Sequence, residues 1–187
     1  MEAKTHICPV WVGYFMANPL RKLIENPHKI VGPYILPGMK ILEIGPAMGF
    51  FSIPMAKMTG RTGKVYCVDI QQKMLNRLKK RAIRKGVSGE IELILASQNS
   101  MNIQYVSGKI DFTLLAYVVH EVPDQFKLFS EIANTMKHEA KVLLLEPKGH
   151  VDELAWKKSL EISEKCGFLL KKLIKMPRSR AAELIFK

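Results

Sequence analysis

A bend with glycine at both ends follows a short apolar run and carries the strongest chemical signal in the sequence. The run Ile41 to Ile44 reads as a strand, and Gly45-Pro46-Ala47-Met48-Gly49 turns the chain into a helix-like segment. Glycine permits a sharp turn and lets a ligand approach the backbone closely. The alternative is a tight strand-to-helix turn with a structural purpose only.

A second signal is Asp69, which ends the apolar run Val65 to Val68 and follows Gly49 by about twenty residues. A carboxylate at this place is able to accept hydrogen bonds from both ribose hydroxyls of a bound nucleoside. One helix separates the two signals, so together they predict a site for an adenosine-type cofactor. A helix-capping aspartate is the alternative interpretation.

The spacing of the glycines argues against a dinucleotide. A dinucleotide fold prefers G-x-G-x-x-G, whereas this chain has Ala47 at the second position and Phe50 at the third. Phe50 would obstruct the close helix–strand packing that the third glycine allows, and Pro46 has no backbone N–H to donate. NAD and FAD are therefore disfavoured.

Strand-like and helix-like segments alternate along the chain. The expected strands cover residues 41–44, 65–68, 91–96, 111–116, 142–145, 168–174 and 181–187. The expected helices cover residues 51–58, 71–85, 124–136 and 151–166. Short apolar strands alternating with helices predict a parallel sheet covered on both faces. We expect an α/β, Rossmann-like, doubly wound fold, with a mostly parallel seven-stranded sheet and an antiparallel C-terminal strand.

The 187 residues are enough for one domain with a single core. Residues 1–35 are expected to form an N-terminal cap or lid, and residues 36–187 the cofactor-binding domain. Trp11, Tyr14 and Phe15 could form an aromatic lid or simply pack on the sheet. His6 and Cys8 could contact a soft acceptor such as a thiol or metalloid, although a lone pair of this kind usually has no role.

The chain is strongly basic, with a formal net charge of +12. Such a charge could attract RNA, an anionic membrane surface or an acidic partner. One basic cluster, Lys79 to Lys85, lies on an expected helix whose other face is apolar, which favours a solvated surface. No aromatic residues interleave with it, which argues against single-strand binding.

The remaining composition is that of a soluble protein. No apolar run approaches the ~20 residues that span a bilayer, and the N-terminus has no signal-peptide pattern, so a cytoplasmic location is expected. Three widely spaced cysteines argue against a disulfide scaffold or a zinc knuckle, and no metal site is expected. Cys67 and Cys166 are expected to be buried thiols.

The motifs resemble those of class I S-adenosylmethionine-dependent methyltransferases. Residues 43–49 look like the first motif of that family, whose glycine loop curls around the methionine part of the cofactor, and residues 68–70 look like the second. Residues 111–124 and 142–147 are similar to the fourth and fifth strands with their exits. The resemblance covers about residues 30–187 and is closest to the small-molecule branch, which includes quinone-biosynthesis and arsenite methyltransferases.

The resemblance implies S-adenosyl-L-methionine as the cofactor and methyl transfer to a small-molecule acceptor as the activity. The positions that it assigns to the cofactor lie in the glycine turn and after the second, third and fourth strands. They are Glu43, Gly45, Pro46, Ala47, Gly49, Asp69, Ile70, Ser97, Gln98 and Ala116.

Two positions depart from the family pattern. The family usually has a central glycine where this chain has Ala47, and the added methyl group could narrow the loop and weaken cofactor binding. After the third strand the family often has an aspartate that contacts the adenine amino group. Ser97 or Gln98 stands there instead, and we expect Ser97 and the backbone to share that contact.

The acceptor side is harder to read, because a sulfonium methyl group is already activated. The protein must align the acceptor and exclude water, and a base is needed only if the acceptor carries a proton. The catalytic candidates just beyond the fourth strand are Tyr117, His120 and Glu121. His120 could act as a base tuned by Glu121 or Asp124. The alternative is that His120 caps a turn and Glu121 is solvated; Glu146 and His150 are secondary candidates.

Three other functions stay open at this point. An RNA methyltransferase would use the basic surface, but no Asn-Pro-Pro-Tyr-type motif follows the fourth strand. A nicotinamide oxidoreductase would need a catalytic pair such as Tyr-x-x-x-Lys, which we do not find. A non-catalytic relative is disfavoured by the intact Gly45, Gly49 and Asp69.

Overall fold

The structure, a computed structural model, describes residues 25–97 and 99–187. These residues form two compact units, one ending at Asn102 and the other running from Ile103 to Lys187. Most of the predicted cap lies outside the described residues, and so does Gln98. The candidate residues of that cap are His6, Cys8, Trp11, Tyr14 and Phe15.

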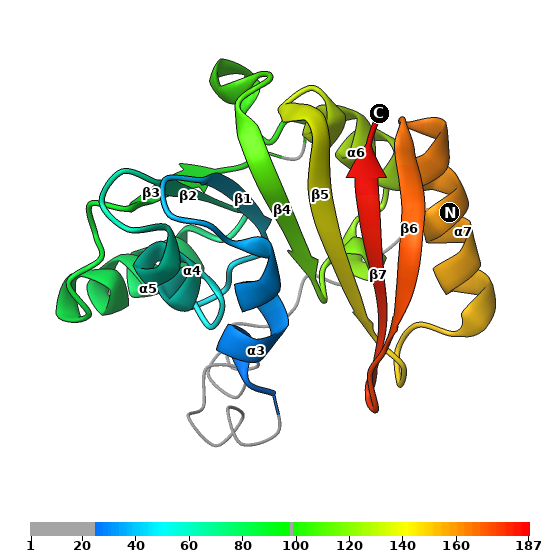
Figure 1. The fold of residues 1–187 in the computed structure, drawn as a ribbon, viewed down its shortest axis with the longest axis horizontal. Helices are drawn as coiled ribbons and strands as arrows, with labels where there is room; N and C mark the ends of the chain where they lie inside the picture. Colours follow the sequence, from blue (N-terminus) through cyan, green and yellow to red (C-terminus); the bar gives the residue numbers. More distant parts are fainter. Residues whose placement is uncertain (1–24, 98) are drawn as a thin grey trace. The chain divides into compact units, whose positions relative to one another are not determined.

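The first unit contains three parallel strands in the order β3-β2-β1 (Figure 1). Their bounds are Lys40–Ile44 for β1, Lys64–Asp69 for β2 and Ile91–Leu95 for β3. Helix α4 (Ser52–Thr59) packs against β1 and β2, and helix α5 (Gln72–Arg84) packs against β2 and β3. The short helix α3 (Pro27–Val31) and the 3-10 turn η1 (Gly32–Tyr34) precede them.

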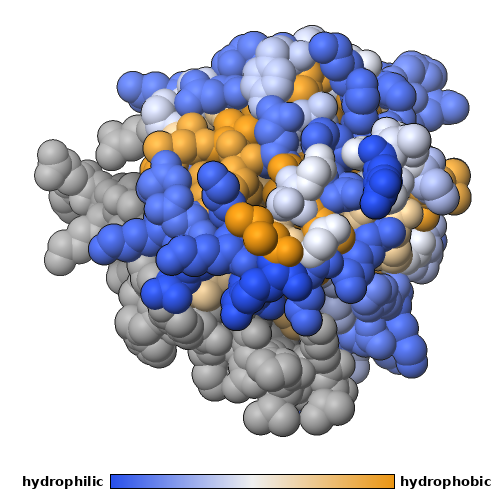
Figure 2. Space-filling view, turned by 90° about the vertical axis from the view of Figure 1, so that its left-hand side faces the viewer, coloured by the Kyte–Doolittle hydropathy of each residue, from blue (hydrophilic) through white to orange (hydrophobic). Residues whose placement is uncertain are grey.

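The two longer helices of this unit differ in burial. Almost every side chain of α4 is buried, whereas α5 buries one stripe, Met74, Leu75, Leu78 and Ala82, and presents basic residues on its other side. This amphipathic pattern is typical of a helix that covers one face of a sheet. The side of the molecule that carries α5 and β3 is mostly hydrophilic around a smaller hydrophobic area (Figure 2).

The second unit contains four strands in the order β4-β5-β7-β6 (Figure 1). Their bounds are Ile110–Ala116 for β4, Met136–Pro147 for β5, Phe168–Lys175 for β6 and Ser179–Phe186 for β7. Strands β4 and β5 are parallel, and β7 is antiparallel to both β5 and β6. The helical segments are η2 (Gln104–Val106), η3 (Val119–Glu121), α6 (Gln125–Ala133) and α7 (Glu153–Lys165).

Helices α6 and α7 lie on one face of these four strands (Figure 1). The core between them contains an aromatic cluster in which Phe129 of α6 contacts Phe168 of β6, and Phe168 contacts Phe186 of β7. Asp124, the first residue of the expected helix 124–136, caps α6 by accepting a hydrogen bond from the Lys127 amide at 2.9 Å.

Every expected strand and helix is present with similar bounds except at one junction, and the structure adds the short helix α3 and the 3-10 turns η1, η2 and η3. Helix α6 ends at Ala133 rather than near Met136, and β5 begins at Met136 rather than at Val142. After the buried Met136, residues Lys137 to Glu139 of β5 are exposed and polar, so they lack the apolar pattern of a buried strand. A register shift and the positive φ of Glu139 mark the same irregular stretch.

Neither a membrane-spanning helix nor a cluster of metal ligands occurs in the described part of the chain. Within residues 25–97 and 99–187, no helix has the length and apolar character that crossing a bilayer requires. Over the same residues, no three histidine, cysteine, aspartate or glutamate side chains are grouped so as to hold a metal ion.

Candidate functional site

The glycine turn leaves β1 and is fixed by its own backbone. The Gly45 amide donates to the carbonyl of Val68 at 2.9 Å, and the Gly49 amide donates to the carbonyl of Pro46 at 2.9 Å. Between them, Ala47 has a φ of 48°, a left-handed conformation that L-residues other than glycine rarely adopt. The departure from the family pattern therefore falls where the backbone itself favours glycine.

Gly49 is required by packing. A Cβ atom added there would lie 2.3 Å from Cδ1 of Leu78, a buried residue of α5, and the φ of Gly49 is 83°. Arg81, one turn further along α5, donates a hydrogen bond to the carbonyl of Met48. Helix α5 therefore supports the turn directly through Leu78 and Arg81.

Arg81 departs from the basic cluster to which the sequence assigned it. Its guanidinium group is half-buried, and burial, together with the positive charge of Arg84, lowers the pKa of Arg81. The interpretation of the cluster as a solvated face holds for Lys79, Lys80 and Arg84, which are exposed, but is wrong for Arg81.

Asp69 ends β2 and is oriented by backbone amides. Its Oδ1 accepts a hydrogen bond from the Gln71 amide at 2.8 Å, and the amides of Ala47 and Ile70 also donate to the carboxylate. Only 9% of Asp69 is exposed, and this burial raises its pKa to about 6, against the lowering effect of the three amides. A carboxylate has about four acceptor positions, so the amides orient the group without filling it.

Apolar and polar side chains are exposed next to Asp69. Ile70 is 44% exposed directly after β2, and Leu95, which pairs with Asp69 in the register of β2 and β3, is 44% exposed. Ser97 follows β3, is exposed, and its Oγ accepts from the Asn99 amide at 3.2 Å. These side chains offer apolar surface for a planar ring and hydrogen-bonding groups for a ribose.

Glu43 lies beneath the turn, where it contacts other protein groups. Its carboxylate is 2% exposed and accepts hydrogen bonds from Ser52 Oγ at 2.5 Å and from Cys67 Sγ at 3.8 Å. Burial raises the pKa of Glu43 to about 7 and raises the pKa of the Cys67 thiol well above its ordinary value. Cys67 is buried as predicted, whereas Cys166 is only half-buried.

The second unit brings His120 and Glu146 together. The Nδ1 atom of His120 is hydrogen-bonded to Oε2 of Glu146, and Oε1 of Glu146 accepts from the Val119 amide at 2.8 Å. Burial lowers the pKa of His120, but the hydrogen bond and charge of Glu146, with the charge of Glu121, raise it overall. The predicted tuning partner was Glu121 or Asp124; the direct partner is Glu146, and Asp124 caps α6 instead.

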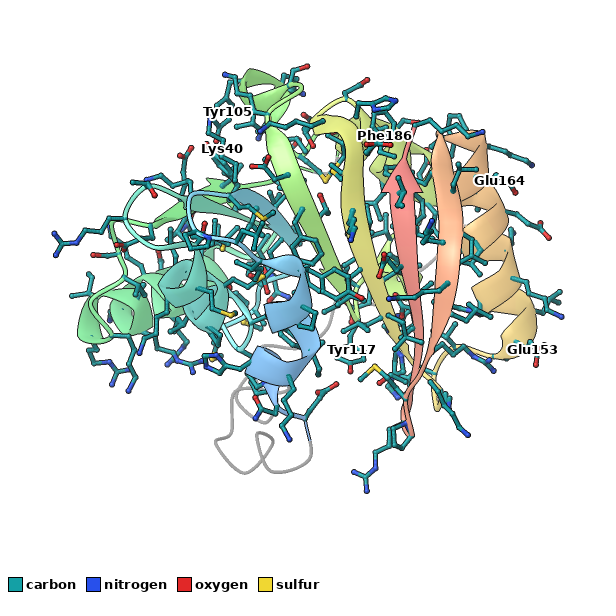
Figure 3. The ribbon with its side chains drawn as sticks, in the orientation of Figure 1. Lys40, Tyr105, Tyr117, Glu153, Glu164 and Phe186 are labelled. Carbon is teal, nitrogen blue, oxygen red and sulfur yellow. The ribbon has the colours of Figure 1, made fainter. Side chains whose placement is uncertain are left out.

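Tyr117 follows Ala116 at the carboxyl end of β4 (Figure 3). Its amide donates to the carbonyl of Leu145 at 2.8 Å, and its hydroxyl is 3.0 Å from Oγ of Ser179 on β7. Its φ of 61° is an outlier for a bulky residue. Such strained positions cluster at functional sites, so the backbone supports the choice of Tyr117 as a candidate.

Sequence reasoning did not identify several side chains that contact the candidate residues. Leu78 and Ser179 lie far along the chain from the groups they contact, and Ser52 lies nine residues from Glu43, with no local pattern that marks any of the three. Glu146 had one available signal: it lies near the carboxyl end of the strand that follows His120, and neighbouring parallel strands place their carboxyl ends together.

Comparisons with known proteins bear on the family and the fold of this chain. Residues 35–177 match a family described as a methyltransferase domain. A demethylmenaquinone methyltransferase of Lactobacillus johnsonii is 28% identical over 118 residues, which are 62% of this chain and 48% of that protein. The ubiquinone/menaquinone biosynthesis C-methyltransferase UbiE of Haemophilus ducreyi is 26% identical over 109 residues, 58% of this chain and 41% of that protein.

The chain thus spans about half the length of the curated relatives it matches. Among solved structures, a SAM-dependent methyltransferase from Aquifex aeolicus has a TM-score of 0.85 at 20% identity, covering 97% of this chain and 100% of that one. This likeness confirms the fold class expected from the sequence.

Proposed function

The chain belongs to the methyltransferase domain family, and from that premise we propose that it transfers a methyl group from S-adenosyl-L-methionine to a small-molecule acceptor. The observation that carries the proposal is the Asp69 carboxylate. Three backbone amides orient it at the tip of β2, and one of them belongs to Ala47 in the glycine turn.

The residues present fit an adenosyl cofactor. Asp69 retains acceptor capacity for ribose hydroxyls, and the exposed side chains of Ile70 and Leu95 offer apolar surface for an adenine ring. Ser97 offers a hydroxyl to the ring edge, and Gln98 is a second candidate by its sequence position. When bound, the cofactor supplies a methyl group attached to a positively charged sulfur atom. On transfer of the methyl group, this sulfur becomes part of a neutral thioether, which is the leaving group.

The glycine turn would hold the methionine part of the cofactor. The cradle consists of Gly45, Pro46, Ala47 and Gly49. Glu43 is buried beneath it and accepts a hydrogen bond from Ser52. The support that α5 gives the turn keeps this cradle rigid, and rigidity of this kind reduces the entropy lost on binding.

On the acceptor side we propose Tyr117, His120 and Glu121, all after the carboxyl end of β4, whereas Ala116, the last residue of that strand, stays on the cofactor side. Ligands of open α/β sheets bind at the carboxyl ends of strands. The relatives named for demethylmenaquinone and for ubiquinone/menaquinone biosynthesis support an acceptor of the quinone class.

The test is a methyl-transfer assay with isotopically labelled S-adenosylmethionine. We expect label to appear in a reduced demethylmenaquinone analogue and not in total RNA. Transfer to RNA alone would replace the small-molecule proposal, and absence of transfer together with absence of cofactor binding would contradict the proposed function.

A further inference from the structure

Glu146, the residue before the last one of β5, has 1% of its side chain exposed, and both of its carboxylate oxygens are engaged. One oxygen accepts from the Val119 amide and the other is bonded to His120 Nδ1. When Glu146 is ionised it only accepts hydrogen bonds, and Nδ1 then carries the proton of this contact. The lone pair of the neutral ring is then on Nε2, and 23% of the His120 side chain is exposed.

We propose that Glu146 is a positioning residue that makes His120 a general base, and that the methyl acceptor is a phenol-type compound whose hydroxyl group must lose a proton. This inference rests on the proposed methyl transfer. A general base serves an acceptor that carries a proton at neutral pH, and the hydroxyl group of a reduced quinone, the acceptor class supported by the relatives, is such a group.

The proton-transfer step balances within the protein and the acceptor. The O–H bond of the acceptor breaks, its electron pair stays on oxygen, and the proton forms an N–H bond at Nε2 of His120. Glu146 stays ionised and offsets the charge of the imidazolium ring. The phenolate that results shares its electron pair with the ring carbons, and either the oxygen or a ring carbon is then the nucleophile.

Charged and titratable groups face His120 from three directions. Glu146 comes from β5, Glu121 comes from η3, and the His150 ring lies with its centroid 6.1 Å from that of His120. The two carboxylates favour the imidazolium form, and burial opposes it. A general base must be neutral, so activity should rise with pH as His120 loses its proton and then level off.

The first test is the tautomer of His120, read from the ring nitrogen shifts by NMR. We expect the Nδ1–H tautomer in the wild-type protein. In Glu146→Gln the side-chain amide can donate to Nδ1, so we expect the Nε2–H tautomer and a lower pKa of His120. An Nε2–H tautomer in the wild type would overturn the proposal, and this measurement needs neither a folded variant nor a cofactor.

The second test is kinetic, with labelled S-adenosylmethionine and a reduced demethylmenaquinone analogue. Glu146→Gln and His120→Gln should each lower kcat by about 100-fold or more, with little change in KM. S-adenosylhomocysteine should bind both variants as it binds the wild type. His138→Gln, an exposed histidine near the start of β5, and Glu164→Gln, which projects from α7 (Figure 3), should leave kcat unchanged.

The two possible failures are distinguishable. If the wild type binds no S-adenosylhomocysteine and transfers no methyl group, the proposed function fails, whatever the tautomer of His120. If the wild type is active and His120→Gln keeps kcat within about threefold of it, the dyad proposal alone is overturned.

Discussion

The amide of Ala47 donates a hydrogen bond to the carboxylate of Asp69, so the turn after β1 and the tip of β2 are joined directly. The two positions are separated by α4 and by the whole of β2 in sequence. A ribose bound at Asp69 would therefore meet a carboxylate whose orientation is already set by the turn. This pre-organisation reduces the ordering that binding requires.

Replacing Ala47 by glycine should stabilise the protein. The left-handed φ of 48° costs alanine about 1–2 kcal/mol, and glycine recovers this while losing about 0.4–1 kcal/mol to its more flexible unfolded state. We expect Ala47→Gly to raise the free energy of unfolding by about 0.5–1 kcal/mol in urea titrations. A decrease in stability would show that the methyl group of Ala47 makes packing contacts that outweigh the strain.

Replacing Gly49 by alanine should cost more than replacing Gly86, which follows α5. Both have positive φ, but a Cβ at Gly86 meets nothing within 4 Å, whereas one at Gly49 meets Leu78 at 2.3 Å. We expect a loss of about 1 kcal/mol for Gly86→Ala and a further loss of about 1–3 kcal/mol for Gly49→Ala. Urea unfolding of both variants measures the difference.

A double variant separates the clash from the backbone strain at Gly49. Shortening the neighbour in Leu78→Ala removes the atom that the new Cβ would meet. The loss in Gly49→Ala/Leu78→Ala should therefore be smaller than the sum of the two single losses. If the two stability losses were simply additive, contact with Leu78 would not be the reason why position 49 is a glycine.

Glu43 should make stability fall as the pH rises. Its pKa is about 7 in the folded protein against 4.5 for an ordinary glutamate of the unfolded chain, so the folded state binds more protons between these values. Its stabilising contribution is complete below about pH 4.5 and is lost as the pH rises to 7. Glu43→Gln should flatten this pH dependence and raise the free energy of unfolding at pH 7.5 by at most about 3 kcal/mol.

Thermal and urea unfolding between pH 4.5 and pH 7.5 would measure this effect. Glu164→Gln removes an exposed carboxylate from α7 and serves as the matched control. Equal pH slopes in the wild type and in Glu43→Gln would show that the buried carboxyl group is not what titrates in this range.

The Tyr117 hydroxyl and Ser179 should be energetically coupled. Tyr117→Phe and Ser179→Ala each remove one partner of the 3.0 Å hydrogen bond between Tyr117, which follows β4, and β7. We expect each to lower the free energy of unfolding by about 0.5–1.5 kcal/mol, and the double variant to lose less than the sum. A coupling energy near zero would show that this contact contributes nothing to stability.

Local patterns made the fold and the cofactor side predictable. The glycine turn and Asp69 each lie at the end of an apolar strand, so their positions follow from the sequence once the strands are recognised. The start of β5 was not predicted because Lys137 to Glu139, which follow its first residue, are exposed and polar. A strand whose consecutive side chains are all solvated has no hydrophobic period to reveal it.

Contacts between distant segments were not predictable in the same way. The pairing of His120 with Glu146 depends on the parallel register of β4 and β5, and short-range sequence patterns do not predict that register. Arg81 looked like one member of a solvated basic cluster because its partner is a backbone carbonyl, that of Met48. A backbone acceptor carries no side-chain signature in the sequence.

The central claim is that Asp69 binds the ribose of an adenosyl cofactor, and calorimetric titration with S-adenosylhomocysteine tests it most directly. We expect Asp69→Asn to weaken binding by about 10- to 100-fold, the effect of losing hydrogen bonds to a charged acceptor. Asp152→Asn, which keeps an equivalent cap on α7, is the matched control and should bind as the wild type does.

The pH dependence makes this measurement specific to the carboxylate. Since the pKa of Asp69 is about 6, wild-type affinity should fall when the pH is lowered from 8 to 5, whereas the affinity of Asp69→Asn should not. Equal affinities of the wild type and Asp69→Asn at pH 8, or no binding by either, would contradict the ribose-binding role of Asp69.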